Sequence, residues 1–202
     1  MTKEEFAARL KSACAAVAEA EAELTEIDSR FGDADHGLTM AKIAGAISGA
    51  ADRGEGGVRA MLDDAACAVM TLNGGSAVPL WNTWLDGMQE AAPAGEVIDL
   101  AGLRAIFAKG LDELAGMSGA QVGDKTMMDA LIPASEAIAA YEGTDEGGLF
   151  TAAAQAAMEG AQATRQFVSK FGRAKSYGEK TIGTPDAGAM SMAYFFQGLA
   201  RP

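Results

Sequence analysis

Apolar residues recur at every third or fourth position along most of the chain, the period of a helix that buries one face. No convincing run of alternating apolar and polar residues indicates a β-strand. The pattern predicts helices over residues 3–27, through Met40 and Ile47, over 58–72, from Ala77 past Met88, over 100–114, from Thr126, over 148–171 and over 190–199. These predict an all-α fold, a barrel or bundle of about eight antiparallel up-and-down helices.

Two of the predicted helix starts carry the spacing of a capping box. Thr2 stands three residues before Glu5, and Thr126 stands three residues before Asp129. In such a box the hydroxyl at the start accepts a backbone N–H, and the acidic side chain accepts one in return. We therefore expect the first helix to begin after Thr2 and the sixth near Thr126.

Connections between antiparallel helices alternate between the two ends of a bundle, so every second connection emerges at the same end. The connections after the first, third, fifth and seventh helices are residues 28–37, 73–77, 117–125 and 172–188. They hold clustered aspartates, the single histidine, a Gly-Gly-Ser turn and a loop with several cations. The opposite set is mainly Gly, Glu, Pro and Ala: 53–57, 91–97 and 142–147. We expect one end to hold the functional site.

Length and charge limit the class of protein. The 202 residues read as one domain, 1–202, without repeats or linkers. With 28 acidic and 16 basic residues the net charge is −12, which repels nucleic acid and anionic membranes. The acidic N-terminal segment is no signal peptide and no apolar run is long enough to cross a bilayer, so we expect a cytoplasmic protein. Cys14 and Cys67 lie in Ala-rich helical patterns and are expected to be buried, reduced thiols.

Three carboxylates and the only histidine crowd one connection: Asp28, Asp33, Asp35 and His36. Asp28 follows a helix, at the unfavourable end of the dipole for a negative charge. Mutual repulsion opposes ionisation of all three unless a cation neutralises them. Oxygen ligands favour Mg²⁺ or Ca²⁺, and the glutamate of an EF-hand is missing. Because Mg²⁺ held by a few carboxylates keeps positions open for phosphate, the segment predicts a Mg–phosphate site.

Other interpretations of this segment stay open. It can be a solvated loop in which Asp35 caps the next helix. His36 can contact a nucleotide phosphate, which we favour, act as a phosphohistidine carrier, or serve as a structural hydrogen-bonding group. Histidine is a poor ligand for Mg²⁺, so it is left out of the predicted metal set.

The other three connections at this end each carry a weaker signal. Gly75 and Ser76 stand before a helix, where free N–H groups can hold phosphate, although ordinary caps explain them equally well. The run 123–126, Gly-Asp-Lys-Thr, lacks the upstream glycines of a Walker A motif. Residues 172–188 show no regular pattern, and their glycines and cations favour an ordered anion-binding lid over a mobile loop. In that lid Arg173 is suited to stabilise a transferring phosphoryl group.

In this order the four segments resemble the nucleotide-binding L subunit of dihydroxyacetone kinases, over nearly the whole chain. The matching runs are Gly32-Asp33-Ala34-Asp35-His36-Gly37, Gly74-Gly75 with Pro79-Leu80, Gly123-Asp124-Lys125-Thr126-Met127, and Gly172-Arg173-Ala174 through Gly178-Glu179 and Ile182-Gly183 to Asp186 and Gly188. Each run alone has modest specificity. Four in register, each at a helix junction, make coincidence an inadequate explanation.

The resemblance implies a barrel of eight antiparallel helices that binds ADP or ATP at one end with two Mg²⁺ ions. It assigns Asp28, Asp33 and Asp35 to the metals, and these three with Arg173 to catalysis. The implied nucleotide contacts are His36, Gly37, Leu38, Thr39, Gly75, Ser76, Ala77, Gly119, Thr126, Met127, Arg173, Asp186, Ala187 and Gly188.

The resemblance also implies a division of labour between chains. A separate K subunit would bind a short-chain ketose or hydroxyketone, such as dihydroxyacetone or an erythrulose-like sugar, through its own histidine. The donor stays open between exchangeable ATP and tightly held ADP that a phosphohistidine protein of the sugar phosphotransferase system recharges. A homodimer also stays open. The rival interpretation is a non-catalytic nucleotide- or lipid-binding regulatory protein on the same scaffold.

Several positions depart from the motifs that the resemblance leads us to expect. Residues 76–78 read Ser-Ala-Val where Ala-Ser-Gly is usual, and Ser118 stands where glycine is expected, which leaves Gly119 as the nearer equivalent. Thr39, Ala187 and residues 175–177 also differ from the usual residues. These changes spare the three aspartates and affect the expected phosphate contacts and docking surface.

Overall fold

The computed structural model describes residues 1–53 and 56–201. Within these ranges the chain forms helices and, apart from an isolated bridge between Thr2 and Val97, no strand pairing. The elements are α1 (Lys3–Glu19), α2 (Glu21–Ser29), α3 (His36–Arg53), α4 (Val58–Met70), α5 (Ala77–Ala91), α6 (Leu100–Ser118), α7 (Met128–Ala140), α8 (Glu146–Ala163), η1 (Thr164–Gln166), η2 (Arg173–Thr181) and α9 (Ala187–Ala200). The prediction of an all-α fold is confirmed.

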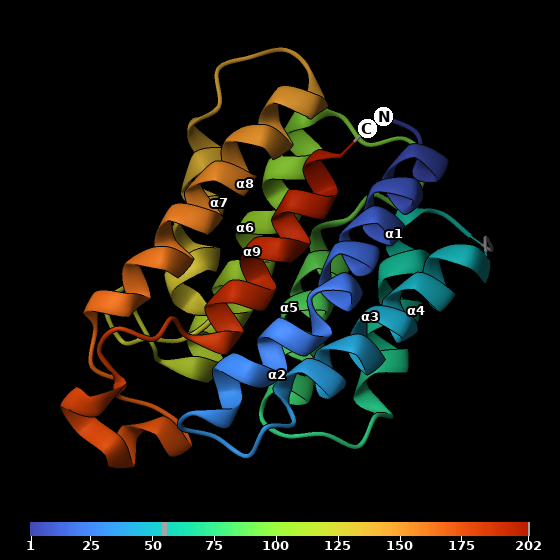
Figure 1. Cartoon of the computed structure of the whole chain (residues 1–202). Coiled ribbons are helices and arrows are strands. Elements are labelled where there is room, and N and C mark those ends of the chain that lie inside the picture. The colour runs from blue at the N-terminus through green and yellow to red at the C-terminus, as the bar shows by residue number, and fades with distance from the viewer. Residues whose placement is uncertain (54–55, 202) are drawn as a thin grey trace.

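The long helices form a closed ring. From α3 to α9 each helix packs on the next, α1 packs on α3, and α9 returns to pack on α1 (Figure 1). Arg9 on α1 fastens this closure by donating from Nη1 to the carbonyl of Leu199 on α9, at 2.7 Å. The short helix α2 lies against α3 and α9 at one end of the ring.

Aromatic side chains fill the middle of the barrel. Trp84 is fully buried and packs against four rings, with centroid distances of 5.3 Å to Trp81, 5.4 Å to Phe195, 6.2 Å to Phe107 and 6.3 Å to Phe196. All four contacts are edge-on or tilted, the arrangements that aromatic quadrupoles favour. This packing gives no support to the lipid-binding interpretation, which places a ligand in the barrel interior.

The predicted first helix, 3–27, is in fact two helices. Ala20 leaves the helical conformation (φ −89°, ψ 5°), so α1 ends at Glu19 and α2 restarts at Glu21. Neither glycine nor proline marks the break, and buried residues continue at helical spacing across it. The bend brings α2 close to α3 at Gly37, where a Cβ would lie 2.1 Å from the carbonyl oxygen of Glu21.

The predicted seventh helix, 148–171, is also wrong at its end. Helix α8 stops at Ala163, because the Thr164 hydroxyl donates to the Ala161 carbonyl at 2.6 Å and accepts from the Asp186 amide at 2.8 Å. Phe171 therefore lies beyond the helix and is exposed rather than on its inner face. Part of the stretch predicted to be irregular, 172–188, folds into the 3₁₀ turns of η2.

Three smaller expectations can be compared directly. The capping box of Thr2 and Glu5 is confirmed, with both reciprocal hydrogen bonds present. The box at Thr126 and Asp129 is half formed: Asp129 accepts from the Thr126 amide at 2.7 Å, but the Thr126 hydroxyl accepts from the Met128 amide, at 3.2 Å, rather than from that of Asp129, and the N-cap of α7 is Met127. Cys14 is buried as expected, whereas Cys67 is exposed on the outer face of α4.

The second end of the barrel is closed by backbone contacts between its connections. The Val58 amide donates to the Gly95 carbonyl at 3.0 Å, and the Lys3 amide donates to the Glu96 carbonyl at 2.7 Å. Residues 54 and 55 of the predicted connection 53–57 lie outside the described residues. Within the described part of the chain, no helix combines the length and the apolar character that a membrane crossing needs.

Candidate functional site

A cavity of about 660 Å³ lies at the end of the barrel where the four polar connections meet. We call it the end cavity. Its walls come from residues within the ranges 27–39, 75–81, 118–127, 169–174 and 184–188. The expected gathering of these four connections at one end is thus observed. Figure 1 shows them at the bottom of the barrel, opposite the two chain ends.

The Asp loop, residues 28–37, folds around the carboxylate of Asp28. The Gly32 amide donates to the Asp28 carbonyl at 2.7 Å, and Asp28 Oδ2 accepts from the amides of Asp35 (3.2 Å) and His36 (3.4 Å). Ala34 takes a left-handed conformation (φ +60°) to complete the turn. The loop therefore carries Asp33 and Asp35 back over the end of α2, towards Asp28.

This fold brings the three predicted metal ligands together. One carboxylate oxygen from each of Asp28, Asp33 and Asp35 lies within 4.8 Å of the others. Asp28 is half-buried, and the other two are exposed. Arg173 from η2 pairs with Asp33, Nη1 to Oδ2 at 2.7 Å. The cluster is all oxygen and carries three carboxylates against one guanidinium, which fits a hard divalent cation such as Mg²⁺.

His36 begins α3 and lines the end cavity beside the carboxylates. Its Nε2 lies 3.2 Å from the Ser191 hydroxyl on α9. Burial lowers the pKa of His36, although Asp28, Asp35 and a backbone contact at Ala187 oppose the shift. The imidazole is therefore mainly neutral at pH 7 and joins α3 to α9 at the cavity wall.

The glycine connection brings the start of α5 to the cavity. Gly75, Ser76 and Ala77 line it, and Ser76 is the N-cap of α5 but its side chain makes no capping hydrogen bond. Gly74 packs beside Thr39, where a Cβ would lie 2.9 Å from the threonine methyl group. Ser76 thus stands at the N-cap position, as the serine-cap interpretation expects, but its hydroxyl does not form the capping hydrogen bond.

Lys125 lines the end cavity and ties three segments together there. It is 4% exposed, and its Nζ donates to the carbonyls of Thr164 and Thr184, each at 2.6 Å. Burial lowers the pKa of this ammonium group. Nearby, the buried Asp129 accepts from the amides of Gly123 (2.6 Å) and Thr126 (2.7 Å), and burial raises its pKa. These contacts hold Thr126 in place on the cavity wall and join the end of α8 and the segment just before α9 to the start of α7.

Asp186 is the N-cap of α9, and its Oδ2 accepts from the Ala189 amide at 2.8 Å. It also lines the end cavity, together with Ala187 and Gly188. Burial raises the pKa of Asp186 to about 7, with Asp129 adding to the shift and Lys125 opposing it. The cavity wall thus holds a carboxyl group whose pKa burial raises above its ordinary value.

Most of the residues expected to contact a nucleotide line the end cavity, and three do not. Gly37 is buried against α2, Leu38 is 50% exposed, and Gly119 ends α6 with a left-handed φ of +65°. Sequence reasoning missed several lining residues on the same segments: Ile27, Phe31, Leu80, Trp81, Ser169, Thr184 and Pro185. Trp81 could have been found, because it stands one helical turn after Ala77.

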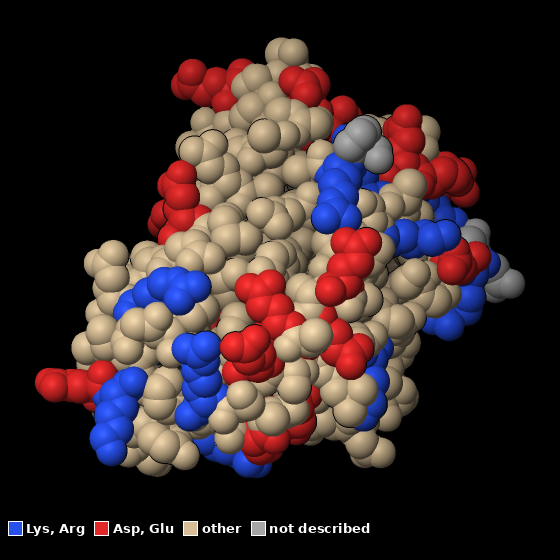
Figure 2. Space-filling model, viewed as in Figure 1, with Lys and Arg blue, Asp and Glu red and all other residues tan. Residues whose placement is uncertain are grey.

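Charge is unevenly distributed around this end. Figure 2 shows lysine and arginine side chains gathered at the lower left, where Figure 1 draws η2. This part of the chain contains Lys170, Arg173, Lys175 and Lys180. It is basic, although the net charge of the whole chain is −12. Basic side chains on the η2 side of the cavity, in an otherwise acidic protein, favour an anionic ligand.

Comparisons with known proteins agree with this geometry. Residues 30–201 match the DAK2 domain family. L-erythrulose 1-kinase of Mycolicibacterium smegmatis is 36% identical over 186 residues, which cover 90% of this chain and 32% of that protein. The ADP-binding subunit DhaL of the PEP-dependent dihydroxyacetone kinase of Escherichia coli is 31% identical over 183 residues, covering 88% of this chain and 86% of the subunit.

A solved structure shares the fold. The dihydroxyacetone kinase of C. freundii, crystallised with AMP-PNP and Mg²⁺, superposes with a TM-score of 0.73 at 25% identity, covering 96% of this chain and 33% of that one. The chain thus spans about a third of the erythrulose kinase and most of the DhaL subunit. On the match to residues 30–201 and this likeness, the chain belongs to the DAK2 domain family, as a DhaL-type domain.

Proposed function

We propose that this domain binds a Mg-nucleotide in the end cavity and passes a phosphoryl group to a small ketose or hydroxyketone held on a separate K-type subunit. The observation that carries the proposal is the cluster of Asp28, Asp33 and Asp35 on the cavity wall, with Arg173 beside it. The names of the relatives support it, since they include erythrulose kinases and an ADP-binding subunit of a dihydroxyacetone kinase.

Asp28, Asp33 and Asp35 would hold the metal, because their carboxylate oxygens already converge. Bound Mg²⁺ supplies positive charge that offsets the charge of the phosphate oxygens during transfer. The backbone hydrogen bonds to Asp28 from Asp35 and His36 fix its carboxylate before any ligand binds. Less reorganisation is then needed on binding.

The remaining cavity residues would position the nucleotide. Gly75, Ser76 and Ala77 present the N-terminus of α5, whose N–H groups and dipole favour a phosphate. Arg173 has a 70% exposed side chain, so its guanidinium can contact phosphate oxygens without being freed from a buried site. It is the group that we expect to stabilise the charge of the phosphoryl group in transfer.

Titration calorimetry tests the binding step. ADP and ATP are titrated into the folded, nucleotide-free chain with Mg²⁺ and with EDTA, using Asp35→Asn and Asp63→Asn. Asp35 is chosen because Asp33 is also paired with Arg173, and Asp63 is an exposed residue of α4 outside the cavity lining. We expect Mg-dependent binding that Asp35→Asn weakens at least tenfold and Asp63→Asn leaves unchanged. Absence of Mg-dependent binding by the folded chain would refute the proposal.

Phosphoryl transfer is tested by adding a K-type subunit loaded with dihydroxyacetone or erythrulose. Transfer from ATP that continues over many turnovers indicates an exchangeable nucleotide. Transfer only when ADP is recharged by a phosphohistidine protein indicates the phosphotransferase-system route. Binding of nucleotide without transfer by either route would leave a nucleotide-binding regulatory domain as the function.

A further inference from the structure

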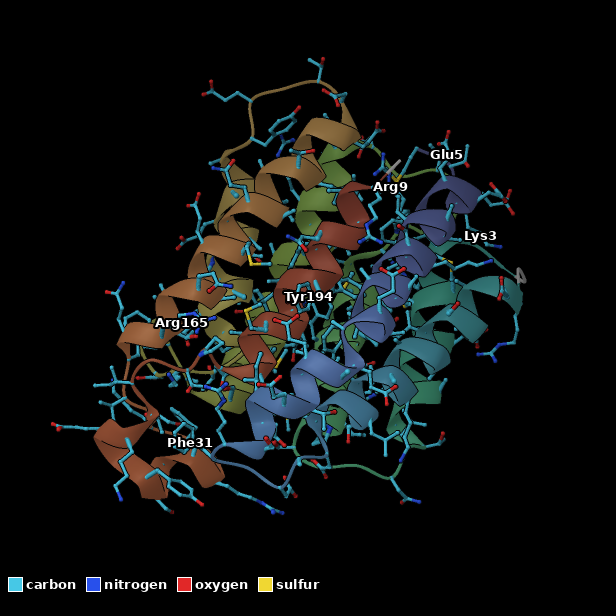
Figure 3. All side chains as sticks on the ribbon, in the orientation of Figure 1. Lys3, Glu5, Arg9, Phe31, Arg165 and Tyr194 are labelled. Carbon is cyan, nitrogen blue, oxygen red and sulfur yellow. The ribbon has the colours of Figure 1, made fainter. Side chains whose placement is uncertain are left out.

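Residues 172–183 form a lid beside the Asp loop, and two side-chain contacts cross between them. One is the ion pair of Arg173 with Asp33, and the other is a ring contact of Tyr177 with Phe31. Figure 3 shows Phe31 beside the segment that carries η2. The two contacts lie four residues apart on the lid, so each restrains the part of η2 that carries the other.

The C-terminal side of the lid is anchored at Thr181 and Gly183. The Ser169 amide donates to the Thr181 hydroxyl at 3.1 Å, and the Gly183 amide donates to the Arg165 carbonyl at 2.7 Å. Gly172 and Gly183, which bound the lid, both have left-handed φ values, of +60° and +95°. Gly178 breaks η2 internally with φ +56°. Lys170, just before the lid, is anchored too, because its amide donates to the Asp124 carbonyl at 3.2 Å. Between these anchors, the two contacts with the Asp loop restrain the part of the lid from Arg173 to Gly178.

The ion pair alone is a weak restraint. The side chain of Arg173 is 70% exposed and that of Asp33 is 36% exposed, so water and salt screen the pair strongly. An arginine that must stay near the carboxylate cluster therefore needs support from elsewhere on its segment.

The ring contact supplies that support. The centroids of Tyr177 and Phe31 are 5.2 Å apart with an interplanar angle of 60°, a favourable tilted pair. Phe31 lines the end cavity, whereas Tyr177 does not, and Tyr177 is 46% exposed. Tyr177 thus touches the loop that carries the metal ligands from outside the cavity.

We infer that Tyr177 is a positioning residue, whose ring clasps the lid to the Asp loop and so holds Arg173 beside the carboxylate cluster. The role given to Arg173 rests on the proposed function. The holding of the lid against the Asp loop by the Tyr177 ring does not depend on it. Contact between the rings, rather than the hydroxyl group of Tyr177, does the holding. Phenylalanine at position 177 should therefore preserve it.

The first test measures the lid directly, without nucleotide or partner. Hydrogen exchange of the amides in 173–181 is compared in the wild type, Tyr177→Ala, Tyr177→Phe and Ile182→Ala. Ile182 is a matched control, because it is an exposed apolar residue of the same lid. We expect exchange about two- to tenfold faster in Tyr177→Ala alone, the range expected for loss of one aromatic pair. Equal exchange in Tyr177→Ala and the wild type would overturn the clasp.

The second test measures transfer to the K-type subunit. If the clasp positions Arg173, Tyr177→Ala lowers kcat about two- to tenfold with a smaller change in the KM for nucleotide, and Tyr177→Phe restores kcat. An unchanged kcat in Tyr177→Ala, or an equal loss in Tyr177→Phe, would overturn the positioning role. Failure of the wild type to transfer phosphoryl groups would instead refute the proposed function, and the exchange result would still decide the clasp.

Discussion

Gly32 leaves open the space that the Asp28 carboxylate occupies: a Cβ built at position 32 would lie 2.0 Å from Asp28 Oδ1. Any side chain there must displace the carboxylate or the loop. We predict that Gly32→Ala weakens Mg-dependent nucleotide binding at least tenfold while the helical circular dichroism is retained. Titration calorimetry measures the loss.

Gly45→Ala is the matched control for that substitution. Gly45 lies inside α3 and a Cβ there would meet nothing within 4 Å. Alanine should leave binding unchanged and stabilise the helix by about 0.5–1 kcal/mol, because it reduces the entropy of the unfolded chain. Equal nucleotide affinity in Gly32→Ala and Gly45→Ala would show that the Asp28 position is not needed for binding.

Substitution of Ser76 should distinguish an effect on stability from an effect on nucleotide binding. Its hydroxyl does not cap α5, whereas Asp99 caps α6 by accepting from the Gly102 amide at 2.7 Å. Ser76→Ala should therefore change the free energy of unfolding by less than about 0.5 kcal/mol, and Asp99→Ala should lower it by about 1 kcal/mol. If Ser76 contacts nucleotide, Ser76→Ala alone weakens binding. Urea denaturation and calorimetry on the same samples distinguish the two effects.

Asp186 should make stability depend on pH. Its pKa is raised to about 7 in the folded protein from an ordinary value of 3.8, so the folded state binds this proton more tightly. Its contribution is fully present below about pH 4 and is lost as pH rises through 7. The free energy of unfolding of the wild type minus that of Asp186→Asn should therefore fall between pH 4 and 8. Asparagine keeps the N-cap acceptor, and a flat difference would contradict the prediction.

The two cysteines should react differently with a thiol reagent. Cys67 is exposed, whereas Cys14 is buried and burial raises the pKa of its thiol to about 12. We predict that one thiol reacts with Ellman's reagent in the folded protein and the second reacts only on unfolding. Cys67→Ser should abolish the rapid phase. Rapid loss of both thiols from the native protein would argue against the buried position of Cys14.

The sequence predicted the barrel because almost every helix carries a continuous buried stripe. The predictions of helix ends and of side-chain burial fail where the apolar periodicity carries no information. The break at Ala20 preserves the stripe, and the end of α8 depends on hydrogen bonds from Thr164 to residues far away in sequence. Cys67 shows the same limit, since composition placed it in a helix without saying which face it occupies.

The site was predictable to the extent that it depends on which connections share an end. That rule brought the three aspartates, Gly75 and Arg173 to one cavity. The resemblance added Leu38 and Gly119, and neither lines the cavity: the Leu38 side chain is half exposed, and Gly119 ends α6 with a left-handed φ. The rule could not show that Lys125 bonds backbone carbonyls, because its partners lie 39 and 59 residues away along the chain.

The closure of the ring between α1 and α9 has a kinetic consequence. These helices contact each other across nearly the full described sequence, as the Arg9–Leu199 hydrogen bond shows with its separation of 190 residues. Contacts between residues so far apart in sequence are slow to form, because the chain must lose much conformational entropy before these contacts stabilise it. Asp186, Ala187 and Gly188 at the start of α9 meet the Asp loop only when the ring is closed. Recovery of nucleotide binding during refolding should therefore lag behind recovery of helix content.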